Sequence, residues 1–441
     1  MDLLEQIYNA GVVGAGGAGF PTHKKLNCKV QYFIINAAEC EPLLQTDKYI
    51  MRNFSHEIIK AAEAVSAEVG ADKTVIALKR KYIDEIEALN KAIKDLNSKV
   101  KLHYLKSIYP AGDEHVLVND VTKKVIPPGG IPLNVGAVVN NVGTVLNIYE
   151  AMNGLPVTEK YVSVLGEVNS PKIVKVPIGT SVLECIKAAG GASIKDFVII
   201  MGGPMMGRLI SGDDIEKRTI TKTDGGIIVL PENHYLVTQR QVPIEHLINR
   251  AKSACIQCSA CTEMCPRHLL GHPLRPHKIM RAISTTDDYG ESFKEALICS
   301  ECGICEMYAC PMGLSPRRIN VFLKGELRKK GIKYSSESKE YNTRDYMDYK
   351  QIDVSRLVGR LNVSRYTMKN INEAEEYIPA EVSIPLKQHI GMTANAVVNA
   401  GDTVTKGQLI ASVKYEDMGA NIHASIDGIV ISVGENIVIK S

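Results

Sequence analysis

The sequence predicts a multidomain α/β protein in which four domains of different texture follow one another along the chain. Three observations predict this architecture. Strands and helices alternate over the first 155 residues, eight of the eleven cysteines fall between positions 255 and 310, and the last part of the chain turns all-β. A chain of 441 residues also exceeds the size that one hydrophobic core usually supports.

Residues 1–155 alternate short apolar strands with amphipathic helices, which is typical of an α/β domain. Apolar residues at three- and four-residue spacing predict helices over residues 53–69 and 82–96. The expected strands cover residues 32–36, 74–78, 102–105 and 136–140.

Residues 156–240 predict a small β-grasp domain. A helix over residues 181–189, closed by Gly190 and Gly191, is expected to follow two strands and to precede two more. The strands are expected at residues 161–165, 172–176, 197–201 and 225–230.

The remaining chain divides into a helical region, a connector and an all-β region. Residues 241–330 hold the clustered cysteines and a predicted helix over 269–283. Residues 331–378 are charged and Tyr-rich, and predict a connector that follows the surface, with a helix at 355–361.

Residues 379–441 contain two glycine-containing hairpins, which predict a barrel-sandwich domain of the biotinyl/lipoyl type. Such domains carry a prosthetic group on a lysine at the hairpin tip. Here the tip reads Ser425, Ile426 and Asp427, without a lysine. A docking or structural role is therefore favoured over that of a swinging arm.

Charge and hydropathy exclude several classes of function. The 52 basic and 49 acidic residues are balanced and scattered, which argues against nucleic-acid binding. The longest apolar runs fall far short of the roughly 20 residues that a membrane helix needs. The N-terminus has acidic residues where a secretory signal needs basic ones, so a cytoplasmic protein without direct membrane insertion is expected.

Two cysteine runs carry the strongest chemical signal. Each run has three cysteines two residues apart and a fourth that precedes a proline. In two-cluster ferredoxins, the fourth cysteine of each run binds the other cluster. The spacing therefore predicts one [4Fe–4S] cluster on Cys255, Cys258, Cys261 and Cys310, and a second on Cys299, Cys302, Cys305 and Cys265.

The alternative metal is zinc, which uses two C-x-x-C pairs for each tetrahedral site. Two triplets with a trailing Cys-Pro do not divide in that way, so iron–sulfur clusters are favoured. The last spacing of the second run is one residue longer than usual. Cys28, Cys40 and Cys185 lie outside the pattern and are expected to be packing residues, and of the three only Cys40 lies beside other candidate site residues.

A glycine-rich segment near the N-terminus lets backbone N–H groups approach a phosphate or a flat ring. Such a segment alone is also compatible with a plain turn. It is neither a Rossmann fingerprint nor a P-loop, because no strand precedes it and no Gly-Lys-Ser/Thr ending follows. Its glycines are Gly14, Gly16, Gly17 and Gly19.

Polar residues follow several of the predicted strands, where α/β sheets bind ligands. The asparagine amides can both donate and accept hydrogen bonds, and the carboxylates can hold a ribose, although each can also be part of a turn. These residues are Asn36, Glu39, Glu41, Tyr109, Gly112, Asp113, Glu114, Asn140, Asn141 and Thr144. Because a flavin exchanges both electron pairs and single electrons, such a site beside two clusters would complete a relay from NADH.

Together these motifs resemble the RnfC / complex I NADH-binding flavoprotein superfamily over nearly the whole chain. The resemblance rests on the glycine segment, the strand-end segments, both cysteine runs, the Gly-Gly-Pro-Met-Met-Gly run at 202–207 and the Gln-His-Ile-Gly run at 388–391. Residues 158–235 resemble an SLBB domain, a β-grasp module associated with soluble ligands that include cobalamin.

The resemblance implies FMN bound by the glycine loop and the strand-end residues, with NADH stacked on the flavin. Phe20 and Lys25 match the positions that assist NADH in the complex I relative. Ala15 and Ala38 replace an arginine and an aspartate of that pattern.

The C-terminal place of the barrel-sandwich domain favours the branch of cobalamin reductases of propanediol utilisation. The resemblance therefore implies an NADH-dependent reductase that passes electrons through FMN and two [4Fe–4S] clusters to cob(III)alamin or cob(II)alamin, free or on a carrier enzyme. A bacterial microcompartment, with a shell protein or an adenosyltransferase as partner, is the implied setting. The alternatives are an RnfC-like or amino-acid-reductase-associated electron carrier, and a cobalamin-binding module with structural clusters.

Overall fold

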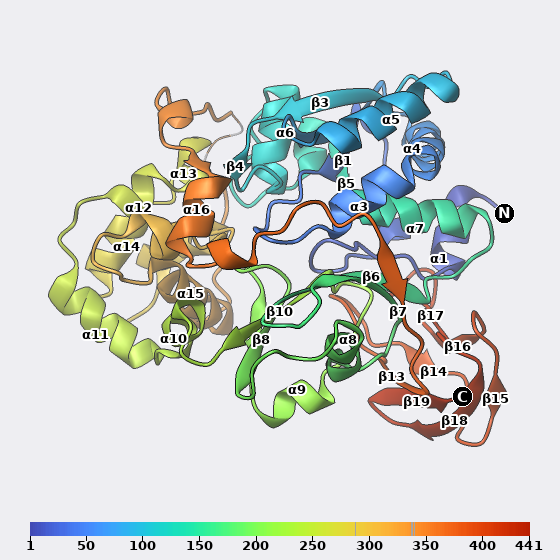
Figure 1. Cartoon of the computed structure of the whole chain (residues 1–441). Helices are drawn as coiled ribbons and strands as arrows, with labels where there is room; N and C mark the ends of the chain where they lie inside the picture. Colours follow the sequence, from blue (N-terminus) through green and yellow to red (C-terminus); the bar gives the residue numbers. More distant parts are fainter. Residues whose placement is uncertain (287, 337, 339) are drawn as a thin grey trace.

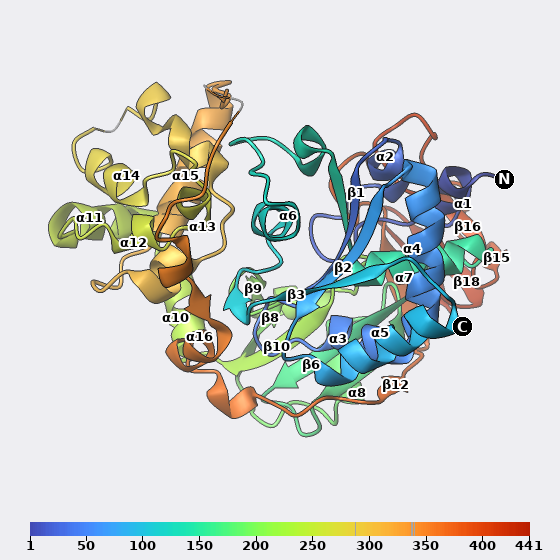
Figure 2. The same ribbon diagram turned by 90° about the horizontal axis from the view of Figure 1, so that it is seen from above.

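Four groups of elements make up the computed structural model of the chain, which describes residues 1–286, 288–336, 338 and 340–441. In Figure 1 the N-terminal group (blue to cyan) lies above the β-grasp group (green), and the cysteine-containing helices lie at the left. The C-terminal strands lie on the opposite side of the molecule from those helices in both views (Figures 1 and 2). Among the described residues, no helix combines the length and the apolar character that crossing a bilayer demands.

A parallel four-stranded sheet forms the centre of the N-terminal domain, in the order β3-β2-β1-β5. Phe33 and Ile35 of β1 pack on one face, and Ile34 packs on the other, because successive side chains of a strand alternate. Both faces are therefore covered, as parallel sheets require. The predicted strands are confirmed as β1 (Tyr32–Ala37), β2 (Lys73–Lys79), β3 (Lys101–Leu105) and β5 (Ala137–Asn141).

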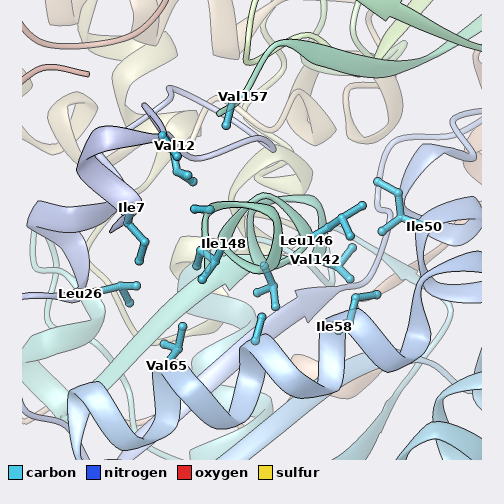
Figure 3. Close-up of a cluster of buried hydrophobic side chains, with 14 of the residues drawn as sticks. Ile7, Val12, Leu26, Ile50, Ile58, Val65, Val142, Leu146, Ile148 and Val157 are labelled. Atoms are coloured by element: carbon cyan, nitrogen blue, oxygen red, sulfur yellow. The ribbon is translucent and has the colours of Figure 1, made fainter. Parts of the chain in front are cut away.

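Helices α4 (Ser55–Val69) and α7 (Val142–Met152) pack together on the first face of this sheet. Figure 3 shows Ile58 of α4 near Val142 of α7, and Val65 of α4 on the side of Ile148, with Ile7 completing the cluster. Helix α6 (Glu114–Thr122) covers the second face. The remaining elements are α1 (Leu3–Asn9), α2 (Thr22–Leu26), α3 (Thr46–Asn53), α5 (Ile83–Asp95), β4 (Ile108–Tyr109) and the 3-10 turn η1 (Pro132–Val135).

The β-grasp domain is built on a mixed six-stranded sheet in the order β12-β7-β6-β10-β8-β9. Its helix α8 (Val182–Ala188) begins where the Ser181 Oγ accepts a hydrogen bond from the Glu184 N–H at 3.1 Å. Gly190 and Gly191 follow that helix with positive φ angles, as the sequence predicts. The other elements are β6 (Glu159–Gly166), β7 (Lys172–Pro177), β8 (Phe197–Met201), β9 (Arg208–Ile210), β10 (Gly226–Pro231) and α9 (Asp213–Lys217).

The cysteine-containing region is helical, but the helix predicted over residues 269–283 is wrong in its first half. Pro273 cannot donate to a helix, and Pro276 disfavours the helical conformation at Arg275, so the helix begins at Pro276. The elements are α10 (Tyr235–Gln241), α11 (Ile244–Ala254), α12 (Ala260–Glu263), α13 (Pro266–Leu269), α14 (Pro276–Ala282), η2 (Glu291–Ile298), η3 (Cys305–Ala309) and α15 (Pro316–Lys329).

The connector does more than follow the surface. Its strand β11 (Ile352–Asp353) pairs with β4, and β12 (Ala374–Glu376) adds an edge strand to the β-grasp sheet. Leu357 of the predicted helix, α16 (Val354–Arg360), is fully buried. The segment thereby joins the N-terminal and β-grasp domains, and Leu357 packs in one cluster with Cys302 and Met307 of the cysteine-containing region. It also contains the turns η4 (Met347–Tyr349) and η5 (Ser364–Tyr366).

The C-terminal domain consists of two antiparallel sheets, β13-β19-β18-β15 and β14-β16-β17. The loop predicted as a hairpin tip lies at an interface, because Ser425 is fully buried and its Oγ donates to the Ile178 carbonyl at 2.6 Å. This position favours a structural role. The strands are β13 (Glu381–Pro385), β14 (Asn395–Ala396), β15 (Thr403–Val404), β16 (Leu409–Ser412), β17 (Ile422–His423), β18 (Gly428–Val433) and β19 (Asn436–Lys440).

Candidate functional site

A cavity of about 930 Å³ lies where the carboxyl ends of β1 and β5 meet the β-grasp domain. Its walls come from the glycine segment, the strand-end loops, β6, the 202–207 loop and Lys406 of the C-terminal domain. Nine of the residues singled out in the sequence line it, namely Gly16, Gly17, Asn36, Glu39, Glu41, Tyr109, Gly112, Asp113 and Asn141.

Seven other singled-out residues do not line this cavity. Lys25 and Glu114 pair with each other at 2.9 Å, and the Thr144 Oγ accepts the Ala15 N–H at 2.9 Å. The Asn140 amide nitrogen is buried without a hydrogen-bond partner in the part of the chain that the structure describes. The set is Gly14, Gly19, Phe20, Lys25, Glu114, Asn140 and Thr144.

The glycine segment presents bare backbone to the cavity. A Cβ added at Gly17 would meet nothing within 4 Å, whereas one at Gly16 would lie 2.8 Å from the Asn141 side chain. Gly16 therefore allows a close approach between the loop and the end of β5, and Gly17 leaves room for a ligand. The cradle fits a flat ring or a phosphate.

A group of buried acids forms one wall of the cavity. The Asp47 N–H donates to the Glu39 carboxylate at 3.2 Å, and the Asn141 amide donates to Asp47 at 2.8 Å. Burial, and then the charge of Asp47, raise the pKa of Glu39 to about 8. Glu39 is therefore largely protonated at neutral pH.

Glu41 binds protein backbone within the structure. Its carboxylate accepts the N–H groups of Met205 and Met206 at 2.8 and 2.9 Å. A Cβ at Gly203 would fall 2.2 Å from Glu41, so this glycine is required for the close approach. The 202–207 motif thus anchors the β-grasp domain to the strand-end loop.

Sequence reasoning missed the residues that the β-grasp domain contributes to the cavity. Lys160, Tyr161 and Asp224 line it, as does Asp47 from the N-terminal domain. None of them belongs to a motif, and only the packing of two domains brings them to the site. Lys160 is nearly buried, and burial lowers its pKa.

The eight clustered cysteines line two further cavities, four in each. Cys255, Cys258, Cys261 and Cys310 surround one, and Cys265, Cys299, Cys302 and Cys305 surround the other. These are the two crossed groups that the spacing predicts. Burial, together with the neighbouring thiols, raises the pKa of Cys261 and of Cys265 to about 12, so a bound cation would be needed to hold them as thiolates.

The backbone has the same conformation in both cysteine runs. Gln257 and Glu301 have positive φ angles at equivalent positions, and so do Ser259 and Gly303. Left-handed residues are uncommon outside glycine, and alternating them turns successive N–H groups toward one point, as in the nests that hold iron–sulfur clusters. The Glu301 N–H accordingly donates to the Cys299 sulfur at 3.4 Å.

The additional residue of the second run is accommodated in a π-helical turn over Cys305–Ala309. A π-helical turn holds more residues than an α-helical turn, so the additional residue fits within it. Cys310 therefore reaches the cavity of the first run despite the longer spacing.

The nucleotide-sized cavity and the Cys265 cavity share a wall. Tyr109 lines the large cavity, and its hydroxyl donates to the Cys302 carbonyl at 2.8 Å. Asp113 lines the same cavity and forms a buried ion pair with Arg267, two residues after Cys265. The structure thus places the large cavity next to one of the two cysteine cavities.

Four domain families match the chain in the order in which its domains occur. Residues 7–150 match the Nuo51 FMN-binding domain, and residues 161–209 match the SLBB domain. Residues 254–315 match a 4Fe-4S dicluster domain, and residues 363–441 match the RnfC barrel sandwich hybrid domain. The multidomain fold predicted from the sequence is therefore confirmed.

Several curated proteins are similar over most or part of the chain. Cobalamin reductase PduS of Salmonella typhimurium is 42% identical over 98% of this chain and 95% of its own length. The same protein of Citrobacter freundii is also 42% identical, over the same shares. One component of the proton-translocating ferredoxin:NAD(+) oxidoreductase complex of Clostridium ljungdahlii is 36% identical over 61% of this chain and 56% of its own length.

A solved structure has a related fold. A chain of an NAD+-reducing [NiFe]-hydrogenase in the H2-reduced state superimposes with a TM-score of 0.50 at 19% identity. The match covers 74% of this chain and 62% of that one. At this identity the likeness concerns the fold alone.

Proposed function

Because the chain belongs to the family of PduS cobalamin reductases, we propose that it is an NADH-dependent flavo-iron–sulfur reductase of cobalamin. When bound, FMN exchanges a hydride with NADH and single electrons with [4Fe–4S] clusters, so these cofactors supply the redox chemistry. One observation carries the proposal: Tyr109 and Asp113, which line the large cavity, contact Cys302 and Arg267, in the loops around a cavity that four cysteines line.

The residues of the large cavity fit FMN and a nicotinamide nucleotide. Gly16 and Gly17 offer backbone N–H groups without side chains, and the Asn36 and Asn141 amides can bind polar ring edges. Protonated Glu39 keeps one negative charge out of a cavity that must accept phosphates. Phe20 and Lys25 lie outside the wall, so a contact with NADH would require the nucleotide to extend beyond it.

The cysteines fit two [4Fe–4S] clusters with crossed fourth ligands. We assign one cluster to Cys255, Cys258, Cys261 and Cys310, and the other to Cys299, Cys302, Cys305 and Cys265. Four thiols around each cavity, a π turn that brings Cys310 across and inward-facing N–H groups support this assignment.

The acceptor and the setting follow from the family. Cobalamin, free or on a carrier enzyme, is the proposed terminal acceptor. A bacterial microcompartment in the cytoplasm is the proposed location, with a shell protein or an adenosyltransferase as partner. An RnfC-like electron carrier is the second candidate, because the C-terminal domain matches the RnfC barrel sandwich family.

The proposal is tested by anaerobic stopped-flow spectroscopy of the reconstituted holoprotein. NADH is expected to bleach the flavin absorbance first and the iron–sulfur absorbance afterwards, and added cob(III)alamin or cob(II)alamin should restore both. A flavin that NADH does not bleach would exclude the enzyme. Bleaching by NADH without reoxidation by either corrinoid would favour the RnfC-like carrier.

Crossed ligation has its own test. Cys265→Ser is expected to impair the cluster of the second run, and Cys310→Ser that of the first, as measured by iron content and EPR. Cys185→Ser serves as the control, because this buried cysteine lies in the β-grasp core. If each of the two variants lost iron only from the cluster of its own cysteine run, crossed ligation would be contradicted.

A further inference from the structure

One ion pair joins the large cavity to the loop of the second cysteine cavity. Both Arg267 Nη atoms donate to the Asp113 carboxylate, the Nη2–Oδ2 distance being 3.0 Å. The two side chains are only 10% and 13% exposed. Asp113 lines the large cavity, and Pro266, next to Arg267, lines the cavity of Cys265. The pair therefore spans the wall between the two sites.

Asp113 also binds the start of a helix, which fixes the position of its carboxylate. Its carboxylate accepts the His115 and Val116 N–H groups at 3.1 and 3.3 Å, and so caps helix α6. Arg267 in turn lies in the first turn of α13, two residues after the cysteine that crosses to the other run. Two rigid helix ends thus hold the two charges.

The two histidines packed beside the pair are neutral. The His115 and His272 rings lie 5.4 Å apart beside it, and burial lowers their pKa values to about 3 and about 4. Neither imidazole carries a charge at neutral pH. The Cys265 and Cys302 sulfurs also lie near the Arg267 guanidinium, so Asp113 is the carboxylate that balances it beside the cysteine ligands.

We propose that the Asp113–Arg267 pair is a positioning and potential-setting device, which locks the Cys265 loop to the large cavity and balances the charge between the two redox sites. The inference rests on the proposed function. Buried charges act strongly on their surroundings, because the protein interior screens them less than water does. Loss of Arg267 alone leaves a negative charge that disfavours an added electron, and loss of Asp113 alone leaves a positive charge that favours it.

The test is an EPR redox titration of the reconstituted holoprotein. Asp113→Asn keeps the helix cap and a hydrogen-bond acceptor but removes the negative charge, so the midpoint potential of the Cys265 cluster should become more positive. Arg267→Gln should shift the same potential to more negative values. The double variant should return close to wild type, and Arg267→Lys, which retains the charge, should shift least.

Assignment of the shift to one cluster uses a Cys258→Ser background, in which the other cavity lacks a thiolate. Arg218→Gln is the matched control, because the Arg218 Nη2 donates to both carboxylate oxygens of Asp224, on the β-grasp side of the large cavity. That variant should leave the cluster potential unchanged.

Several outcomes would overturn the proposal, and one would contradict the proposed function. Shifts of equal sign in the two single variants, or no shift, would overturn it. A single variant that loses iron should lose it from the Cys265 cluster alone and regain it in the double variant, and equal loss from both clusters would also overturn it. Wild-type protein without two cluster signals would instead contradict the proposed function itself.

Discussion

Glu39 illustrates how one residue acquires a property that its type does not predict. Its carboxyl group lies in the cavity wall beside Asp47, and the Lys79 ammonium donates to its backbone carbonyl rather than to its side chain. Burial and the neighbouring carboxylate therefore outweigh the attraction of the lysine, and the pKa rises to about 8. A glutamate that the sequence predicts as a charged ribose ligand is thus a neutral acid at pH 7.

The first prediction concerns the pH dependence of flavin binding. The Glu39 side chain ionises as the pH rises through about 8, and adds a negative charge to the cavity that would accept the FMN phosphate. FMN affinity should therefore fall roughly several-fold above that pH and remain level below it. Glu39→Gln should remove this fall, as measured by flavin fluorescence quenching across the range.

Glu114→Gln is the matched control, since Glu114 pairs with Lys25 outside the cavity wall. Its pH profile should resemble that of the wild type. An unchanged profile in Glu39→Gln would mean that another group titrates, with Asp47 as the next candidate.

At the scale of an element, the glycine segment shows two uses of the same residue type. Gly16 lies against Asn141, so its lack of a Cβ serves packing between two loops. Gly17 faces open space in the cavity, so its lack of a Cβ serves the ligand. The repeated glycines of the motif are therefore not equivalent.

The second prediction separates these two uses. Gly17→Ala should leave the unfolding temperature unchanged and weaken FMN binding about tenfold, which corresponds to about 1.4 kcal/mol. Gly16→Ala should lower both the unfolding temperature and the affinity for FMN. Its methyl group must displace the Asn141 side chain and break the hydrogen bond from Asn141 to Asp47. Differential scanning fluorimetry and flavin titration measure the two effects.

Gly359→Ala in α16 is the control. A Cβ there meets no atom within 4 Å, and the residue lies far outside the cavity lining. This variant should bind FMN as the wild type does and gain about 0.5–1 kcal/mol from the better helix propensity of alanine. Equal FMN affinities in Gly17→Ala and Gly359→Ala would argue against a ligand at Gly17.

At the scale of the whole molecule, Lys222 joins three domains. Its ammonium group is fully buried and donates to the carbonyls of Gly11 and Asn421, at 2.7 and 2.6 Å. Gly11 belongs to the N-terminal domain and Asn421 to the C-terminal one, while Lys222 itself lies in the β-grasp domain. The next residue, Thr223, lines the large cavity, so this contact also supports the cavity wall.

The third prediction concerns stability. Lys222→Met removes the donor that two buried carbonyls share, and should destabilise the flavin-free protein by about 2 kcal/mol. Burial lowers the pKa of Lys222 from 10.5 to about 7. Between about pH 7 and pH 10.5 the unfolded chain binds more protons than the folded chain. The free energy of unfolding of the wild type should therefore rise with pH over this range, and this gain should be lost as the pH falls toward 7. The variant should show a smaller rise, as measured by thermal unfolding.

Lys406→Met is the matched control, because Lys406 also crosses from the C-terminal to the β-grasp domain but pairs with Glu159 at the surface, 42% exposed. Its effect should stay within about 1 kcal/mol. If the free energy of unfolding of both lysine variants changes with pH as it does in the wild type, Lys222 keeps its proton on folding. The interface would then tolerate a buried charge.

The sequence alone determined the features that depend on local spacing. Triplets of cysteines two residues apart already define two groups of four, and the apolar periods locate the central strands and helices. The same local rules failed at residues 269–283, where two prolines outweigh an apolar pattern. They also could not show that an additional residue before Cys310 becomes a π turn.

Only the tertiary structure decided which polar residues share a site. It separated the nine strand-end and loop residues that face the cavity from the seven that do not, and added Lys160 and Asp224 from another domain. It likewise brought Arg267 against Asp113, 154 positions apart in the chain. Periodicity encodes which face of an element is buried, but the distance between two distant side chains depends on how whole domains pack, and no local pattern carries that information.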